Sequence, residues 1–267
     1  MYQIIERNNN LLQILDKYND SIYVIKGRDK SLVIDLGMDE DPIKGLLDSK
    51  IETPYEVIVT HGHFDHVGRS GEFDSIYMSL LDYDLYLDNY HLETSDDLFD
   101  ISKLSLIDVS KIREVKESYD LGDRIINIIP CPGHTPGSII IVDQENKTVL
   151  TGDAIGSGCG VWMQVDRALS IKDYHDSLVT CLGVLKDFDV DESWLFLGGH
   201  NHQEYESKVS SFNKFDLRIL EDMIILCEKL LQGELTYEKS LATEFSMGKP
   251  YYACYHKAEI IFTLSQL

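Results

Sequence analysis

The chain has 267 residues, of which 43% are hydrophobic, and this is enough to bury a substantial core and to exclude a disordered protein. Lysine and arginine number 24 against 46 aspartates and glutamates, which gives a formal net charge of −22. This charge repels nucleic-acid backbones and anionic membrane surfaces, so we expect neither as a partner.

The N-terminal sequence and the cysteines favour a cytoplasmic protein. Residues 1–7 show no positively charged start followed by an apolar stretch, and no apolar run is long enough to span a bilayer. The five cysteines are widely spaced and form no Cys-x-x-Cys pair that would indicate a disulfide framework or a zinc knuckle. We therefore expect free thiols.

Short strand-like runs separated by turn signals open the chain. Residues 11–15, 21–25 and 31–36 predict a meander of antiparallel strands. A helix follows, with Asp41 as its expected cap and Pro42 at its first position. The apolar run 57–59 predicts the next strand.

The stretch 77–116 is acidic and rich in tyrosine, with helical spacing and no strong strand signal. We interpret it as a possible helical lid inserted into the domain. A pair of solvated surface helices explains the same pattern equally well.

Strand and helix signals alternate through the rest of the chain. Strands are predicted at 125–129, 138–142, 148–150 and 194–197, a helix begins at the capping box of Ser170 and Asp173, and a second helix carries an apolar stripe over 212–231 before Gly233. No internal repeat and no Pro/Gly/Ser-rich linker divides the sequence. We therefore predict one layered α/β domain over residues 1–267, with helices covering the sheets.

The sharpest chemical signal is a cluster of three histidines and one aspartate directly after the strand at 57–59: His61, His63, Asp65 and His66. Side chains two positions apart point the same way in an extended chain, so the first three can converge while His66 turns aside. Imidazoles and carboxylates together are ligands for zinc, or for iron or manganese. A lone histidine is more often structural, but clustering favours a metal site.

Three further candidate ligands share one local setting, in which a strand-like run leads to a glycine-containing turn and then to the residue. They are His134, Asp153 and His200. Residues at strand ends can meet at one rim of a sheet, and the glycines permit the tight turns that direct them.

These motifs resemble the metallo-β-lactamase-fold superfamily in composition and in order. The resemblance rests on His-x-His-x-Asp-His at 61–66, Pro-Gly-His-Thr-Pro-Gly-Ser at 132–138, Gly-Asp at 152–153 and Gly-His at 199–200, and it spans most of the chain. It implies an αββα four-layer sandwich. It also implies two divalent metal ions, the first held by His61, His63 and His134, the second by Asp65, His66 and His200, with Asp153 bridging them.

Two such metals, about 3.5–4 Å apart, can share a water and lower its pKa towards about 7. The resemblance therefore implies a metal-dependent hydrolase, expected to use zinc, in which a bridging hydroxide cleaves a small ester, thioester or lactone. Asp65 and Asp153 are the carboxylates that we expect to act in catalysis. The alternatives are a small-molecule phosphodiesterase and a non-catalytic metal-binding or sensory module.

The resemblance is more specific in one stretch. Residues 152–160 look like those of the hydroxyacylglutathione hydrolases (glyoxalase II), which cleave thioesters. Those enzymes continue with basic and aromatic residues that help to bind glutathione, whereas residues 161–163 here read Val-Trp-Met. This departure disfavours glutathione but leaves a thioester open. Cys159, Trp162 and the tyrosines at 251–255 either line the substrate pocket or serve packing alone, and His202 is interpreted as a surface or supporting group.

Overall fold

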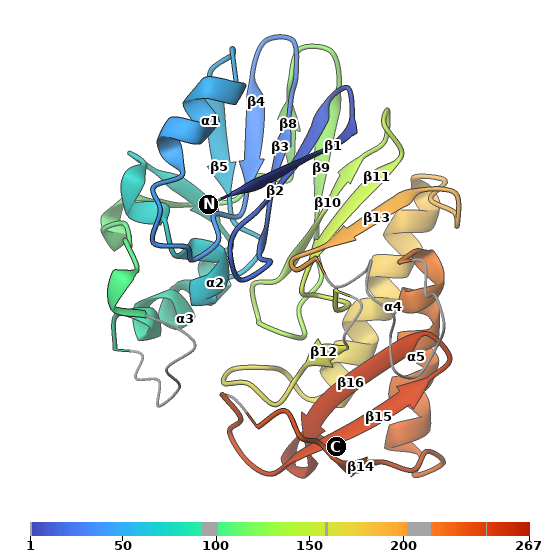
Figure 1. Ribbon diagram of the computed structural model, residues 1–267. Coiled ribbons are helices and arrows are strands. Elements are labelled where there is room, and N and C mark those ends of the chain that lie inside the picture. Colours follow the sequence, from blue (N-terminus) through green and yellow to red (C-terminus); the bar gives the residue numbers. More distant parts are fainter. Residues whose placement is uncertain (1, 92–100, 158–159, 202–214, 244) are drawn as a thin grey trace. The chain divides into compact units, whose positions relative to one another are not determined.

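The computed structural model describes residues 2–91, 101–157, 160–201, 215–243 and 245–267 (Figure 1). The chain divides into two compact units, Met1–Asn127 and Ile128–Leu267. The boundary falls within one strand, so neither unit is set off from the other by a linker. No linker was predicted at this position either.

A seven-stranded sheet forms the centre of the first unit, and its strands follow one another in chain order. The predicted meander at 11–36 is confirmed, and β5 and the strands after it join the sheet in parallel. The strands are β1 (Gln3–Asn8), β2 (Leu11–Leu15), β3 (Ser21–Ile25), β4 (Ser31–Ile34), β5 (Tyr55–Ile58), β6 (Ile76–Met78) and β7 (Ile112–Glu114). After them, β8 (Ser118–Asp120) pairs with the first residues of β9 (Ile125–Pro130).

In the described residues of this unit, the α-helices are α1 (Lys44–Lys50), α2 (Phe64–Val67) and α3 (Tyr83–Asp88). The predicted start of the first helix at Pro42 is wrong, because α1 begins at Lys44. The carboxylate of Glu72 accepts hydrogen bonds from the backbone N–H groups of Ile43 and Lys44 at 3.0 and 2.8 Å. The free backbone N–H groups at the start of α1, which a local cap residue would normally satisfy, are therefore satisfied by Glu72, 28 residues after Lys44.

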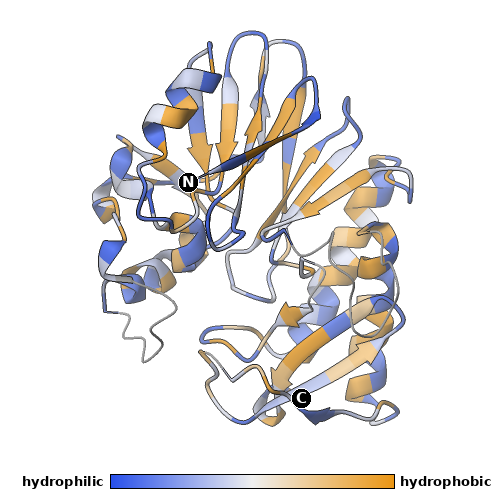
Figure 2. Cartoon of the chain, in the orientation of Figure 1, coloured by the Kyte–Doolittle hydropathy of each residue, from blue (hydrophilic) through white to orange (hydrophobic). Residues whose placement is uncertain are grey.

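The core of the first unit uses one side of each central strand. Leu12, Ile14, Ile22 and Val24 pack with Leu47 of α1 and other buried residues. The alternate side chains of the same strands are buried as well. Apolar colouring along the strands in Figure 2 reflects this, since strands buried on both faces are hydrophobic almost throughout.

The stretch 77–116 differs from its predicted helical character at both ends. It begins within β6 and contains β7, so the sheet includes residues that the spacing assigned to helices. Only α3 and short 3-10 turns supply helical structure between them in the described part, and residues 92–100 lie outside it. A lid at this position stays a prediction.

The strands in the described part of the second unit belong to two sheets, of which the first also includes β8. The order of the first is β13-β11-β10-β9-β8, and that of the second is β12-β16-β15-β14. Their strands in this unit are β10 (Ile139–Asp143), β11 (Thr148–Gly152), β12 (Val161–Trp162), β13 (Leu195–Gly198), β14 (Glu238–Lys239), β15 (Pro250–Tyr255) and β16 (Ala258–Thr263). The tyrosines at 251–255 thus belong to the strand β15. This agrees with the alternative in which they serve packing.

Two long helices, α4 (Ile171–Asp187) and α5 (Leu217–Leu231), lie side by side in this unit (Figure 1). The predicted cap of α4 is confirmed, because Ser170 Oγ accepts from the N–H of Asp173 at 3.0 Å. The carboxylate of Asp173 accepts from the hydroxyl of Ser170 at 2.7 Å, so the reciprocal bond to the backbone that a full capping box requires is replaced by a side-chain bond. The helix α5 begins later than predicted, after the cap Asp216, and residue 212 lies outside the described part. Both helices bury an apolar stripe against the sheets, which gives this unit its own core.

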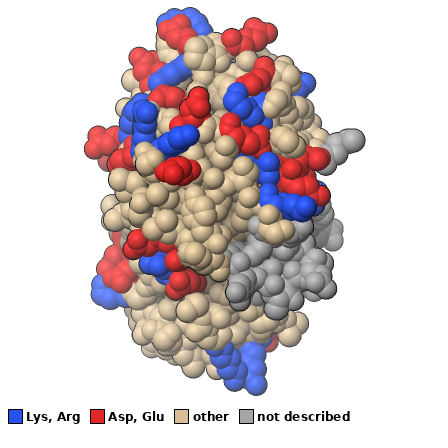
Figure 3. All heavy atoms as spheres, turned by 90° about the vertical axis from the view of Figure 1, so that its left-hand side faces the viewer, with Lys and Arg blue, Asp and Glu red and all other residues tan. Residues whose placement is uncertain are grey.

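Charged side chains on the face shown in Figure 3 include both signs, interspersed with each other. None of the described helices combines the length and the hydrophobicity that crossing a membrane requires.

Candidate metal centre

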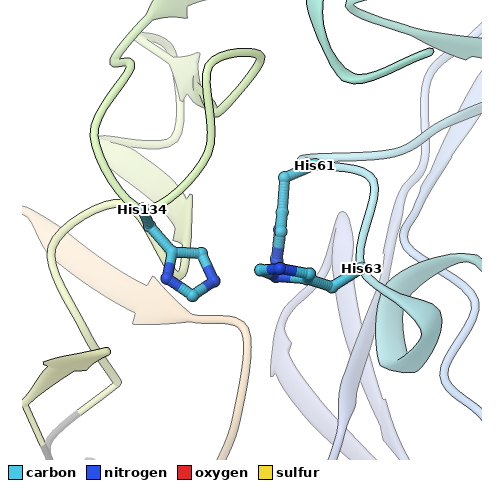
Figure 4. Close-up of side chains that lie close together, drawn as sticks. All are labelled: His61, His63 and His134. Atoms are coloured by element: carbon cyan, nitrogen blue, oxygen red, sulfur yellow. The ribbon is translucent and has the colours of Figure 1, made fainter. Parts of the chain in front are cut away.

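Each unit carries part of the predicted ligand set. His61, His63, Asp65 and His66 belong to the first unit, and His134, Asp153 and His200 belong to the second. Figure 4 shows the side chains of His61 and His63 on the loop that follows β5, and that of His134 on the loop that follows β9. We refer to the two sets as the first and the second half-site.

The first half-site forms where β5 ends and α2 begins. The rings of His61 and His63 lie edge to face with their centroids 4.9 Å apart, and the rings of His61 and His66 are 4.0 Å apart. The predicted alternation holds as far as His63, whose backbone is extended. It is wrong for Asp65, because the chain has entered α2 by then. The Oδ2 atom of Asp65 lies 3.7 Å from Nε2 of His66.

Asp35 supports two of these histidines from the end of β4. Its Oδ2 is 2.9 Å from Nδ1 of His66 and also accepts the hydroxyl proton of Thr60 at 2.8 Å. Since that proton is committed to Asp35, Thr60 Oγ1 accepts from Nδ1 of His61 at 3.2 Å. Both histidines therefore carry their proton on Nδ1 and present the lone pair of Nε2.

The backbone conformation of Asp35 is part of this arrangement. Its φ of +60° lies in the left-handed region, which aspartate adopts more readily than most residues. Asp35 is 1% exposed, and its Oδ1 accepts the N–H of Thr60 at 2.7 Å. A carboxylate fixed by several donors holds the histidine rings in one orientation. The sequence analysis did not identify Asp35, because it precedes the histidine motif by 26 residues.

A second carboxylate braces the loop itself. Asp82, which is fully buried, accepts the N–H of Gly62 at 2.9 Å, and Asn89 donates to the carbonyl of Gly62 at 2.8 Å. Both backbone polar groups of Gly62 are thereby satisfied, and the segment between His61 and His63 is fixed.

The second half-site converges on one carboxylate. The Oδ2 atom of Asp153 lies 3.2 Å from Nε2 of His200 and 3.9 Å from Nε2 of His134. Its Oδ1 accepts from the hydroxyl of Ser157 at 3.3 Å, and the same hydroxyl oxygen accepts the N–H of His200 at 3.1 Å. The three residues predicted from separate strand ends thus lie together within this unit.

His134 is oriented by a backbone group. Its Nδ1 is 2.7 Å from the carbonyl oxygen of Trp162, which can only accept, so the proton is on Nδ1 and the lone pair on Nε2. Metal-bound histidines have this arrangement, with the second ring nitrogen donating to a carbonyl or a carboxylate. The donor set in both half-sites fits divalent metal ions that bind imidazole nitrogen and carboxylate oxygen.

Tyr174 of α4 contacts the two segments that carry His134 and Asp153. A Cβ atom added to Gly133 would lie 2.0 Å from Tyr174 Cδ2, so only glycine allows the tyrosine ring to lie against the residue before His134. Its hydroxyl donates to the carbonyl of Ala154, next to Asp153, at 2.6 Å. Burial raises the pKa of Tyr174 well above its usual value, so the phenol keeps the proton that it donates.

The secondary candidates have mixed outcomes. Trp162 contributes its carbonyl to His134, a role that its side chain could not have indicated. Cys159 and His202 lie outside the described residues.

Comparison with known proteins places these half-sites in a family. The family model of the metallo-beta-lactamase superfamily matches residues 16–202, and all seven predicted ligands fall within it. Acyl-coenzyme A thioesterase MBLAC2 of Gallus gallus is 26% identical over 204 residues, which are 67% of this chain and 72% of that protein. The human and cattle proteins of the same name are matched over 64% of their length, less than two thirds.

A bacterial relative and a solved structure agree with this result. The probable metallo-hydrolase YqgX of Bacillus subtilis is 27% identical over 188 residues, covering 67% of this chain and 83% of the relative. The metallo-beta-lactamase from Pontibacter korlensis has the same fold, with a TM-score of 0.59 at 12% identity over 85% of this chain and 99% of that one. The predicted fold is therefore confirmed, and so is the prediction of a hydrolase. By the extent of the family match, the chain belongs to the metallo-beta-lactamase superfamily.

Proposed function

We propose that the two half-sites together bind two divalent metal ions and that the protein hydrolyses a small thioester. One ion would be held by His61, His63 and His134, the other by Asp65, His66 and His200, and Asp153 would be shared. Zinc is the proposed metal, with iron or manganese as alternatives, because imidazole and carboxylate ligands suit all three. The observation that carries this proposal is that His61, His66 and His134 each engage Nδ1 and present Nε2.

The residues of the chain would orient the ligands and set their protonation. Bound there, two divalent metal ions supply an activated water at neutral pH and stabilise the charge on the leaving group. Asp35 and the carbonyl of Trp162 keep the proton on Nδ1 of their histidines, so the Nε2 atoms remain available without loss of a proton. The Oδ2 atom of Asp153 lies near Nε2 of both His134 and His200, which supports the proposal that this carboxylate would be shared.

A thioester is favoured over an ester or a lactone by two observations. Relatives of this chain are named as acyl-coenzyme A thioesterases. The stretch 152–160 resembles that of the thioester-cleaving glyoxalase II enzymes, whereas Val161, Trp162 and Met163 replace their glutathione-binding residues. A thioester of a thiol other than glutathione fits both observations.

We further propose that the substrate is a small molecule rather than nucleic acid or a membrane lipid, and that the protein is cytoplasmic. The net charge of −22 and the mixed charges of Figure 3 oppose binding to a nucleic-acid backbone or an anionic membrane surface. Cys131, Cys181, Cys227 and Cys254 are free thiols, which are typical of a reducing compartment.

Metal analysis combined with a substrate panel tests this function. The purified protein is expected to contain two metal ions per chain, identified by mass spectrometry, and to hydrolyse acyl-coenzyme A thioesters faster than S-lactoylglutathione, a simple lactone or bis-(p-nitrophenyl) phosphate. His61→Ala and Asp153→Ala should each remove most of the activity. His175→Ala is the matched control, because this histidine lies on α4 and pairs only with surface carboxylates of Asp176 and Glu228 in the described part of the chain.

Three results would contradict the proposal. A protein without bound metal would remove its chemical basis, and activity that survives both ligand substitutions would place the reaction elsewhere. Preferential hydrolysis of the phosphodiester would favour the phosphodiesterase alternative.

A further inference from the structure

The side chain of Gln164 is buried without hydrogen-bond partners. Gln164 is 1% exposed, and neither Oε1 nor Nε2 has a partner anywhere in the part of the chain that the structure describes. An amide removed from water in this way costs free energy on both its donor and its acceptor side. Native proteins rarely retain such a group unless a water, an ion or a ligand satisfies it.

Gln164 lies close to the second half-site along the chain. The pairing of β12 with β16 continues one residue further, since the N–H of Met163 donates to the carbonyl of Ile261 at 2.7 Å. Val161 and Met163 point into the core of the second unit. By alternation, the side chain of Gln164 is expected on the same side as that of Trp162, whose carbonyl orients His134.

The backbone around Gln164 is held firmly. The carbonyl of Gln164 accepts the N–H of Met247 at 2.9 Å, and Gln266 donates to the carbonyls of Met163 and Leu169 at 2.6 and 3.1 Å. The position of the unmatched amide is therefore fixed by its neighbours. A preorganised donor and acceptor of this kind favours binding, because little conformational freedom is lost when a ligand arrives.

A second buried glutamine shows the contrast. Gln13, in β2, is completely buried, but its Nε2 donates to Ser21 at 2.8 Å and its Oε1 accepts from Arg7 at 2.7 Å. Gln13 thus satisfies groups of the protein itself, whereas Gln164 does not. This difference makes Gln13 a matched control for experiments on Gln164.

We propose that Gln164 is a specificity-determining residue that binds an amide group in the thiol half of the thioester substrate. The Oε1 of Gln164 can accept from the N–H of a secondary amide, and its Nε2 can donate to an amide carbonyl. Because a trans secondary amide carries its N–H and C=O on opposite edges, one amide engages one of these groups and a second amide engages the other. A carboxylate or a phosphate only accepts, so it would leave Oε1 unmatched. The thiol arm of coenzyme A contains secondary amides, and an alkyl thiol contains none. This assignment rests on the proposed thioesterase function.

Three thioesters of one acyl group test the proposal on the metal-loaded enzyme. Their thiols are N-acetylcysteamine, 2-acetoxyethanethiol, in which oxygen replaces the amide N–H, and pentanethiol, which has the same chain length without polar atoms. The wild-type enzyme is expected to prefer the amide substrate by at least about tenfold in kcat/KM over either analogue, as for a site built to bind a polar group. Gln164→Met should reduce this ratio to about one, whereas Gln13→Met should retain it.

Thermal unfolding provides a readout that does not depend on activity. Gln164→Met replaces an unmatched buried amide with an apolar side chain of similar length, so its Tm should rise. Gln13→Met removes partners from Arg7 and Ser21, so its Tm should fall. A Tm of Gln164→Met at or below that of the wild type would show that a buried water satisfies the amide, and would overturn the proposal.

The kinetic outcomes separate the two proposals. Equal kcat/KM values for the three thioesters, or a preference that Gln164→Met retains, would contradict the role of Gln164 and leave the thioesterase function intact. If none of the three is hydrolysed, the thioesterase function itself is contradicted, and the assignment of Gln164 fails with it.

Discussion

In the first half-site four predicted ligands lie within six consecutive residues, whereas in the second half-site three ligands come from three separate strand ends. Their supports differ as well. Side-chain carboxylates of Asp35 and Asp82 hold the first set, and a backbone carbonyl and one hydroxyl hold the second. A short segment cannot orient several side chains by itself, so it depends on groups from elsewhere in its unit. For residues at strand ends, the pairing of the strands in the sheet already sets the direction of the backbone.

This difference has a consequence for mutation. The first half-site depends on charged side chains, each of which a single substitution removes. In the second half-site the orientation of His134 depends on a main-chain carbonyl, which no substitution of Trp162 deletes. We therefore expect substitutions of supporting residues to weaken the first half-site more than the second. Substitutions of the ligands themselves should be severe in both.

The largest effect is expected for Asp153→Ala. This change removes the carboxylate that lies between His134 and His200 and that we propose to be shared by both metal ions. With both ions weakened, kcat/KM should fall by about a thousandfold, since loss of about 4 kcal/mol of transition-state stabilisation has this size. Steady-state kinetics and metal analysis of the dialysed protein measure it. Asp176→Ala, an exposed aspartate of the same unit, is the control. Full activity in Asp153→Ala would contradict the shared role.

The next largest effect is expected for Asp35→Asn. Asparagine tolerates the left-handed backbone conformation and retains an acceptor, but it removes the charge next to His66 and Thr60. Loss of a group that supports a metal ligand typically lowers metal affinity by about 10–100-fold. Competition with a chromogenic chelator measures this affinity.

The control for this change is Asp39→Asn in the same unit. Asp39 is also 1% exposed, but it accepts the backbone N–H groups of Lys17 and Asp41. Its substitution should leave the metal affinity as it is. If both variants lost affinity equally, the effect of Asp35 would be one of general stability rather than of histidine orientation.

The proposed ligands could be identified from the sequence, and the groups that support them could not. His61 to His66 form a local motif, and His134, Asp153 and His200 each follow a strand-like run, so composition and spacing identify them. Asp35 lies 31 residues before His66 and reaches it only because β4 and β5 are adjacent in the sheet. Glu72, which caps α1, is equally remote. Hydrogen bonds between distant segments depend on tertiary structure, and no local pattern reports them.

Strand prediction failed for a related reason. The ends of the stretch 77–116 form β6 and β7 although their residues show helical spacing. Three-residue strands are too short to produce a recognisable alternation, and their pairing with neighbours decides their conformation. The strands that the sequence did predict are longer and mostly buried on both faces, so their hydrophobicity alone identified them.

A third prediction concerns stability in the first half-site. Asp82→Ala removes the acceptor for the buried N–H of Gly62 and should lower the free energy of unfolding by about 1–3 kcal/mol. Urea unfolding of the full chain, monitored by fluorescence, measures this difference. Asp84→Ala, an exposed aspartate in the first turn of α3 and two residues after Asp82, should change it by less than about 0.5 kcal/mol. Equal losses for the two variants would show that the brace on Gly62 contributes nothing specific.

The smallest effect is expected for Ser157→Ala in the second half-site. The hydroxyl of Ser157 donates to Asp153 and accepts the N–H of His200, so its loss weakens the position of two ligands at once. A single hydrogen bond of this kind contributes about 0.5–1.5 kcal/mol, which corresponds to about a twofold to twelvefold loss of metal affinity. The strand ends retain the backbone direction of both ligands, and this limits the loss. If Ser157→Ala weakened metal binding as much as Asp35→Asn, the two half-sites would depend equally on supporting side chains.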